Sequence, residues 1–237
     1  MSVSVILPTY NERGNIVILI RNIIATLSKT KAIFEILVVD DNSTDGTTDA
    51  IKKAFGRNRR VRVYIRKNER GLATAIWHGI QKAKGEYVVV MDTDLSHEPK
   101  LLPRMLRIGN DKSMVIASRY IHGGGMEDKL RNVLSHLFNI YLRKLLRIPV
   151  TDFLSGYFCA KTSEIRRLGN SRVKIFVGYG DYFMRLIVAF YRGDGKFVEL
   201  PSFYRTRPYG VTKSRFFAMF VTYTKTSWEI AWAHELR

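Results

Sequence analysis

The strongest constraint on the fold is the alternation of short apolar runs with amphipathic segments through residues 3–91. The apolar runs are β-branched and short, as in buried strands, whereas the segments between them carry apolar residues at three- and four-residue steps, as in helices. Strands are predicted at 3–8, 34–39, 61–65 and 87–91, and helices at 15–28 (capped by Asn15), 47–55 and 71–84. Such an order predicts an α/β fold with a mostly parallel sheet covered by helices on both faces.

Polar loops follow three of these strands directly, at residues 10–12, 40–45 and 92–94. In open α/β sheets, ligands bind beyond the carboxyl ends of the strands. The three loops are far apart in sequence, but this rule brings them to the same edge of the sheet. The sequence therefore predicts a ligand site there.

Asp92 and Asp94 place two carboxylates two residues apart where the chain leaves a buried strand. At this spacing both can reach one hard cation such as Mg²⁺ or Mn²⁺, which prefers oxygen ligands. A cation there would neutralise a diphosphate and stabilise it as a leaving group. The alternative is an Asp pair that caps the next helix.

The other two loops suit a nucleoside. Asp40 and Asp41 could accept hydrogen bonds from a ribose hydroxyl or a base edge, although the run D-D-N-S-T-D-G is also typical of a turn. Tyr10 could stack on a base and Glu12 could accept from a ribose. The alternative for Glu12 is a favourable interaction with the N-terminus of the following helix.

The pattern changes beyond about residue 120. Residues 129–148 are predicted to form a basic amphipathic helix, and residues 214–237 a second helix rich in aromatic side chains. We expect a catalytic domain over 1–213, which includes an amphipathic helix at about 127–148, and a C-terminal amphipathic helix over 214–237. The apolar faces could lie at a membrane surface or pack on the protein itself. The stripe of the first helix consists of Leu130, Leu134, Leu137, Tyr141, Leu145 and Ile148.

The net charge is +18, from 39 Lys and Arg against 21 Asp and Glu. Such an excess favours a polyanionic partner: nucleic acid, an anionic membrane surface or a phosphorylated substrate. The basic stretch 57–70 fits a strand and loop of the α/β order better than a nucleic-acid surface. The single Cys159 excludes an internal disulfide. The N-terminus does not resemble a signal peptide, and no apolar run approaches the roughly 20 residues that span a bilayer.

The loop motifs resemble those of the inverting family 2 glycosyltransferases, which have the GT-A fold. P-T-Y-N-E (8–12), V-D-D-N-S-T-D-G-T (39–47) and D-x-D (92–94) occur in the order found in that family. More narrowly, the chain resembles the polyprenol-phosphate sugar synthases of the dolichol-phosphate mannose synthase type. The resemblance covers roughly residues 3–215. The motifs that carry it are R-G-L-A-T-A (70–75), M-D-T-D-L-S-H-E-P (91–99), S-R-Y (118–120), D-F-L-S-G-Y (152–157) and R-P-Y-G-V-T-K (207–213).

The resemblance implies roles at the donor end of the site. Pro8, Tyr10, Glu12 and Asp41 would hold the nucleoside, with Asp92 at the diphosphate, and Asp92 and Asp94 would bind the Mg²⁺ or Mn²⁺. In the family a Gln two residues after the second Asp is often the third metal ligand. In this chain that position is Ser96, so a hydroxyl or a water would take its place.

The resemblance also implies an acceptor site for a lipid phosphate, formed by Arg119, Arg131, Ser135 and Arg207, with Lys213 nearby. Arg207 would act in catalysis together with Asp92 and Asp94. Guanidinium groups suit phosphate oxygens. A phosphate monoester is largely ionised at neutral pH, since its second pKa is about 6. Such an acceptor needs positioning and charge compensation rather than a strong general base.

We therefore expect an inverting, metal-dependent transfer of mannose from GDP-mannose to dolichyl or polyprenyl phosphate. The protein is expected to be peripheral, on the cytoplasmic face of a membrane, with or without a small membrane-anchoring subunit, and not to bind nucleic acid. Three alternatives remain: a UDP-glucose donor, a saccharide acceptor, and a basic nucleic-acid-binding module. A saccharide hydroxyl would need a catalytic carboxylate, for which Asp181 is the candidate.

Overall fold

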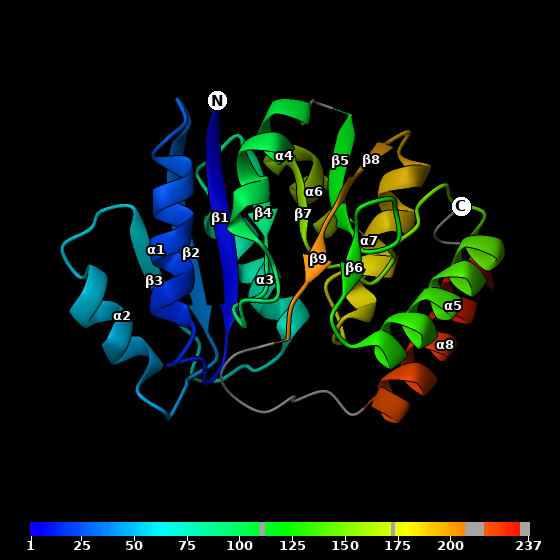
Figure 1. Ribbon diagram of the computed structural model, residues 1–237, viewed down its shortest axis with the longest axis horizontal. Coiled ribbons are helices and arrows are strands. Elements are labelled where there is room, and N and C mark those ends of the chain that lie inside the picture. Colours follow the sequence, from blue (N-terminus) through cyan, green and yellow to red (C-terminus); the bar gives the residue numbers. More distant parts are fainter. Residues whose placement is uncertain (110–111, 172–173, 207–215, 233–237) are drawn as a thin grey trace.

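The computed structural model describes residues 1–109, 112–171, 174–206 and 216–232. Within these residues the central sheet has seven strands in the order β3-β2-β1-β4-β7-β5-β8, and β6 pairs with β9 beside it (Figure 1). The strands are β1 (Ser2–Thr9), β2 (Ile33–Asp40), β3 (Val61–Ile65), β4 (Tyr87–Val90), β5 (Ser113–Ser118), β6 (Gly125–Met126), β7 (Phe158–Lys161), β8 (Lys196–Pro201) and β9 (Phe203–Tyr204).

The first four strands are parallel, as the alternation in the sequence predicts. Their side chains point alternately to the two faces: Ile6 lies in one core, and Val5 and Leu7 lie in the other. All three are fully buried, because helices cover both faces of the sheet. The prediction of an α/β fold with a mostly parallel sheet is therefore confirmed.

The helices are α1 (Ile16–Leu27), α2 (Thr47–Phe55), α3 (Leu72–Lys82), the short 3₁₀ helix η1 (Pro99–Leu101), α4 (Leu102–Ile108), α5 (Lys129–Leu146), α6 (Thr162–Gly169), α7 (Asp181–Arg192) and α8 (Phe216–Trp232). Apolar residues of α1, α2 and α4 form the core on one face of the sheet. Those of α3, α5, α6, α7 and α8 form the core on the other face. The predicted helices in the first part of the chain are present, with ends that differ by at most two residues.

The predicted cap of α1 is wrong. Asn15 occupies the N-cap position, but its side chain makes no capping hydrogen bond and its backbone is already in the helical region. Its Nδ2 instead donates to Oε2 of Glu12 at 2.7 Å. Asn15 therefore supports the carboxylate of a predicted site residue rather than the helix end.

Strand β7 runs against its neighbours. It pairs antiparallel with both β4 and β5, and Cys159 lies opposite Val89 on one side and Val115 on the other. Because β7 is reversed, the segment that leads into it, residues 152–157, lies at the edge where β4 and β5 end. The sequence pattern did not predict this strand, nor the other elements between β4 and α8 apart from α5.

The first half of the apolar stripe predicted for α5 is exposed, whereas Tyr141 packs against the core and Ile148 is buried in it. Leu130, Leu134 and Leu137 are exposed, and the helix turns Phe138 and Leu142 inward instead. The last helix, α8, packs beside α5, as Figure 1 shows, and the rings of Phe138 and Phe220 lie 5.0 Å apart. The C-terminal helix therefore packs on the protein, whereas the division of the chain into domains stays a prediction. None of the helices in the described part of the chain has the length and apolar character that crossing a bilayer requires.

Candidate functional site

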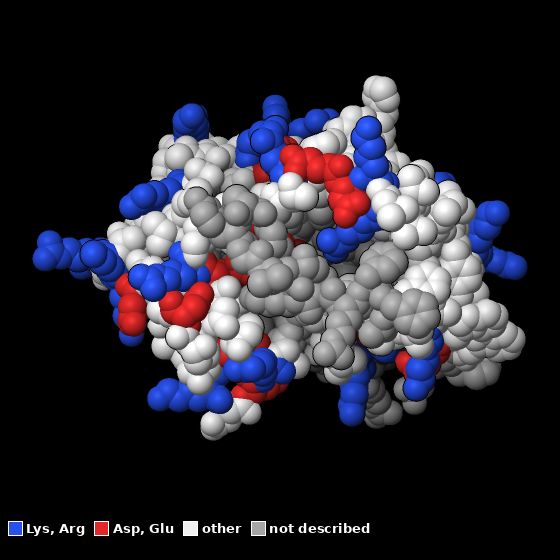
Figure 2. Space-filling model, turned by 60° about the horizontal axis from the view of Figure 1, so that its bottom comes forward, with Lys and Arg blue, Asp and Glu red and all other residues white. Residues whose placement is uncertain are grey.

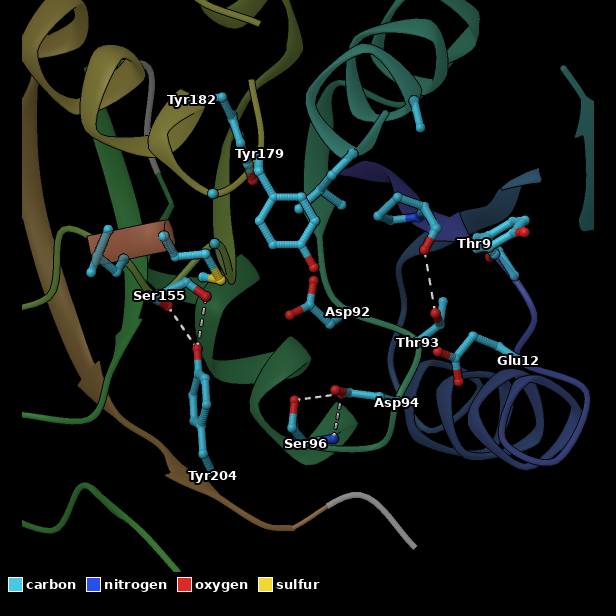
Figure 3. Close-up of a pocket in the computed structure, with 18 of the residues that line it drawn as sticks. Thr9, Glu12, Asp92, Thr93, Asp94, Ser96, Ser155, Tyr179, Tyr182 and Tyr204 are labelled. Atoms are coloured by element: carbon cyan, nitrogen blue, oxygen red, sulfur yellow. Dashed lines mark hydrogen bonds between the residues drawn. The ribbon is translucent and has the colours of Figure 1, made fainter. Parts of the chain in front are cut away.

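A cavity of about 650 Å³ lies beyond the carboxyl ends of β1, β2 and β4. All three predicted loops line it, so the expectation that they converge is confirmed. Figure 3 shows Glu12, Asp92, Asp94 and Ser96 around this space, together with Tyr179 and Tyr204 from the second half of the chain. The predicted site residues on its wall are Pro8, Tyr10, Glu12, Asp41, Asp92, Asp94, Ser96, Arg119 and Arg131.

One predicted residue in the described part of the chain is not part of this wall, and two others lie outside the described part. Ser135 lies on α5, one turn after Arg131, and is half-buried, but it is not among the residues that line the cavity. Arg207 and Lys213 lie outside the described residues. The ligand-binding roles expected of all these residues stay predictions.

Ser96 holds Asp94 in place. Its backbone N–H donates to Oδ1 of Asp94 at 3.0 Å, and its hydroxyl donates to the same oxygen at 2.6 Å. Leu95 between them has a φ of +65°, a left-handed conformation that is uncommon for a bulky side chain. The tight turn thus directs the Asp94 carboxylate and the Ser96 hydroxyl to one point.

Asp92 presents its carboxylate to the cavity, with 45% of the side chain exposed. Its backbone N–H donates to Nδ1 of His97 at 2.9 Å. His97 is fully buried, and this burial lowers its pKa to about 4, so the imidazole is neutral. His97 stands in the D-x-D motif region of the sequence, but no pattern assigned it a role.

A buried arginine, Arg66, holds the carboxylate of Asp41, which is predicted to bind the nucleoside. The carboxylate of Asp41 accepts from Nε of Arg66 at 2.7 Å and from the N–H of Gly71 at 2.8 Å. Gly71 has a φ of +151°, which favours glycine. Asp41 therefore fixes the loop that begins α3, and Arg70 from this loop lies over the ring of Tyr10, 4.3 Å from its centroid.

The carboxylate of Asp40 stabilises a turn, which is one of the two roles considered for it, the other being a ligand contact. It is fully buried, and its two oxygens accept from the N–H of Ser43 at 2.8 Å and from the Ser43 hydroxyl at 2.6 Å. Glu12 at the same edge accepts from Asn15, and its backbone N–H donates to Thr47. The hydrogen bond from Glu12 to Thr47 thus joins the segment after β1 to the segment after β2.

Arg119 also lines the cavity, paired with a carboxylate. Its Nε and Nη2 donate to the two oxygens of Asp152 at 2.8 and 2.7 Å, and its backbone N–H donates to Oδ2. Both side chains are buried. Although burial alone would lower the pKa of Arg119, the charge and hydrogen bonds of Asp152 raise it above its usual value. Arg119 therefore stays charged, and Asp152 fixes its orientation.

Tyr204 lines the cavity and contacts both Arg119 and His97. Its hydroxyl bonds with Ser155, both at the carbonyl oxygen, 2.9 Å away, and at the hydroxyl, as Figure 3 shows. The guanidinium of Arg119 lies 4.8 Å from the centre of its ring. Burial raises the pKa of Tyr204, so its hydroxyl keeps its proton. Asp152, Ser155 and Tyr204 were not singled out as site residues, and only the motif D-F-L-S-G-Y pointed to the first two.

Arg131 lies at the start of α5, where it is exposed to solvent and lines the cavity. Its backbone N–H donates to Asp128, which caps the helix. In the described part of the face in Figure 2, Lys and Arg side chains are spread around the rim with Asp and Glu among them, and do not form one continuous basic surface. The positive charge at the cavity therefore comes from individual side chains such as Arg119 and Arg131 rather than from a continuous basic surface.

The oxygen donors at Asp92, Asp94 and Ser96 fit a hard divalent cation. Among the described residues, no group of three His, Cys, Asp or Glu side chains is arranged to hold a metal ion. Mg²⁺ in phosphate-transferring sites is commonly held by one or two carboxylates, with substrate phosphates and water as the other ligands. Two carboxylates beside an open cavity match that type of site rather than a closed protein cage.

A large part of the chain is similar to known proteins. Residues 4–168 match the model of the family described as glycosyl transferase family 2. A dolichol-phosphate mannosyltransferase of Saccharomyces cerevisiae is 35% identical over 159 residues, which are 65% of this chain and 59% of the relative. One of Pyrococcus furiosus is 36% identical over 172 residues, 70% of this chain and 47% of the relative. The chain thus matches about half of the length of these curated relatives.

The fold is shared with solved structures of glucosyl-3-phosphoglycerate synthase from Mycobacterium tuberculosis. A complex of that protein with Mn²⁺, UDP and phosphoglyceric acid matches with a TM-score of 0.74 at 20% identity, over 98% of this chain and 78% of that one. A complex with Mg²⁺ and UDP matches with a TM-score of 0.69 at the same identity, over 95% and 77%. At this identity the likeness concerns the fold alone.

Proposed function

Since this chain belongs to glycosyl transferase family 2, we propose that it transfers mannose from GDP-mannose to dolichyl or polyprenyl phosphate, with inversion at the anomeric carbon. The observation that carries this proposal is the composition of the cavity. The same cavity presents the carboxylates of Asp92 and Asp94 and the guanidinium groups of Arg119 and Arg131. A space lined by both kinds of group suits a metal-bound diphosphate that meets a second phosphate.

At the donor end, Tyr10, Glu12 and Asp41 are proposed to hold the nucleoside, and Asp92 and Asp94 the divalent cation. When bound, Mg²⁺ or Mn²⁺ supplies positive charge to the departing diphosphate. The chain's own contribution is orientation, because Ser96 and His97 fix the two aspartates before any ligand arrives. Preorganised groups need no rearrangement when charge develops.

At the acceptor end, Arg119 and Arg131 are proposed to bind the lipid phosphate, together with Ser135, Arg207 and Lys213. Nε and Nη2 of Arg119 donate to Asp152, whereas Nη1 takes no part in this ion pair. The ionised phosphate oxygen can attack the sugar without a general base, provided that its charge is compensated. A buried arginine with a fixed fork suits that task.

A saccharide acceptor is disfavoured by the state of its candidate base. Asp181 is buried at the N-terminus of α7, where it accepts from the N–H of Tyr179 at 2.7 Å and faces Arg185 at 3.6 Å. It does not line the cavity. A carboxylate held in this way supports the helix end rather than proton abstraction from a sugar hydroxyl.

Several basic side chains of the stretch 57–70 contact the protein itself. Arg60 lies over Phe34, Arg62 pairs with Glu35, and Arg66 pairs with Asp41. Side chains engaged in this way are poor candidates for phosphate contacts along a nucleic acid. This disfavours the nucleic-acid-binding alternative.

We propose that the protein acts as a peripheral protein at the cytoplasmic face of a membrane. The exposed apolar side chains of α5 and α8 support this, because a patch of this kind beside basic groups suits a headgroup boundary. The exposed residues are Leu130, Val133, Leu134, Leu137 and Ile140 on α5, and Phe220, Val221, Trp228 and Trp232 on α8. Sedimentation with anionic vesicles tests the idea: the wild type is expected to pellet, and a variant with Trp228→Ser and Trp232→Ser to stay in solution. If the wild type does not pellet, a small membrane subunit becomes the better explanation.

The transfer itself is tested with radiolabelled sugar nucleotides. Purified protein with Mn²⁺, dolichyl phosphate and GDP-mannose is expected to give an organic-extractable, acid-labile mannosyl phosphate. Asp92→Asn is the matched control, because it removes one charge and keeps the side-chain shape. A lipid product from UDP-glucose but not from GDP-mannose would replace the donor in the proposal, and no lipid product with either donor would overturn it.

A further inference from the structure

His97 is a fully buried histidine directly beneath the turn that carries Asp92 and Asp94. Its ring stacks on that of Tyr157, with centroids 4.8 Å apart and planes inclined by 13°. The ring of Tyr204 meets it edge-on from another side at 4.7 Å. Two aromatic neighbours of this size hold the imidazole in one orientation.

Both ring nitrogens of His97 face the same residue. Nδ1 accepts the backbone N–H of Asp92 at 2.9 Å, so the proton of the neutral ring is on Nε2. Nε2 has no hydrogen-bond partner among the described residues and lies 3.7 Å from Oδ2 of Asp92. One nitrogen thus contacts the main chain of Asp92, and the other is near its carboxylate.

A role in packing alone does not explain this arrangement. A buried donor without a partner is destabilising, and a phenylalanine would fill the space between two tyrosine rings without that cost. The N–H of Nε2 is, however, well placed for an oxygen of Asp92 that moves slightly toward it. Such a donor is useful where a carboxylate must be held in one orientation while it binds a cation.

We propose that His97 is the positioning residue of Asp92: Nδ1 fixes the backbone of Asp92, and Nε2–H provides a donor for its carboxylate when a metal-bound diphosphate is present. This inference rests on the proposed function, since it assumes a cation at Asp92 and Asp94. Each carboxylate then has its own support within the same turn. Ser96 orients Asp94 through two hydrogen bonds, and His97 orients Asp92.

The test measures Mn²⁺ binding rather than turnover. Free Mn²⁺ is followed by electron paramagnetic resonance while the protein is titrated in the presence of GDP, and GDP binding is followed by calorimetry. His97→Phe keeps an aromatic ring between the tyrosines but removes both nitrogens. We expect it to weaken Mn²⁺ binding by about 10- to 100-fold, the usual effect of losing a residue that orients a metal ligand.

Two further variants separate the contacts. His97→Gln can place an amide N–H near the position of Nε2, and His97→Asn can place an acceptor near that of Nδ1. Both are expected to bind Mn²⁺ more tightly than His97→Phe and more weakly than the wild type. Tyr157→Phe is the matched packing control. It removes a buried hydroxyl that donates to the Glu98 carbonyl while it leaves a ring against His97, and it is expected to leave Mn²⁺ binding unchanged.

The outcomes are distinct. If the wild type fails to bind Mn²⁺ with GDP, the proposed function fails and the role of His97 fails with it. If the wild type binds and His97→Phe binds equally well, only the role of His97 is overturned; the same holds if Tyr157→Phe loses as much affinity as His97→Phe. Should thermal unfolding show that His97→Phe does not fold, His97→Asn decides the question, and wild-type affinity in that variant overturns the inference.

Discussion

The two ends of the cavity are built from different kinds of contact. At the donor end, the carboxylates of Asp94 and Asp40 are held by hydroxyl and N–H groups two and three residues further along the chain. At the acceptor end, Arg119 is held by Asp152, 33 residues away, and Tyr204 by Ser155, 49 residues away. The turns at Asp94 and Asp40 are therefore local, although Asp41 at the same end is held by Arg66, 25 residues away. The hydrogen bonds that hold the Arg119 and Tyr204 side chains come only from the tertiary structure.

Removal of Asp152 gives the largest expected effect and would sharpen this comparison. Asp152→Ala leaves Arg119 buried without its counter-charge, which costs about 3–5 kcal/mol of unfolding free energy. Urea unfolding followed by circular dichroism measures the loss. The matched donor-end variant, Asp94→Ala, removes a carboxylate bonded to a neutral hydroxyl and is expected to cost less. Equal losses in the two variants would contradict the comparison.

Asp92→Asn is expected to act on turnover rather than on folding. Loss of the charge at the diphosphate lowers kcat by about 10²–10³-fold, the range found when one preorganised charge-stabilising group is removed. The unfolding midpoint should stay near that of the wild type, because the side chain is partly exposed. Steady-state transfer of mannose to dolichyl phosphate gives kcat, and a wild-type kcat would exclude Asp92 from catalysis.

Arg131→Gln tests the exposed part of the acceptor end. The loss of a charge-assisted hydrogen bond, worth about 1.5–3 kcal/mol, raises the KM for the lipid phosphate by about 10- to 100-fold. The KM for GDP-mannose is expected to remain unchanged, since Arg131 is proposed to bind the lipid phosphate and not the nucleoside. Kinetics with each substrate varied in turn separate the two constants. Arg143→Gln, on an exposed part of the same helix, is the control.

Ser96→Ala gives the smallest expected effect. It removes one of two donors to Oδ1 of Asp94 and keeps the backbone N–H. The loss of about 1 kcal/mol corresponds to a roughly fivefold weaker affinity for Mn²⁺ in the presence of GDP. A much larger loss would mean that the Ser96 hydroxyl binds the cation directly, as the family resemblance implies for this position.

The difference between local and long-range contacts also explains which features the sequence could predict. The first four strands and their loops follow from periodicity and from residues close together in the chain, and the structure confirms both. The pairing of Arg119 with Asp152 was not predictable, because no local pattern connects a residue after β5 with one before β7. Asp41 was assigned to the nucleoside without its partner Arg66, for the same reason.

Periodicity also predicted α5 without predicting its orientation. The spacing of Leu130, Leu134 and Leu137 identifies a stripe, but whether a stripe faces the core depends on what the rest of the chain places there. The core positions of α5 are instead occupied by Phe138 and Leu142, which pack against the sheet and α8. Asn139, also buried, accepts the N–H of Phe153 at 2.7 Å, and thereby ties α5 to the segment before β7.

The position of β7 also affects the order in which parts of the site can form during synthesis. During synthesis the chain emerges from its N-terminus, and β1 to β4 can pair with one another before residue 158 exists. The Asp152 loop reaches the site only when β7 has entered between β4 and β5. The loops proposed to hold the nucleotide are therefore present in the nascent chain before Asp152 can pair with Arg119.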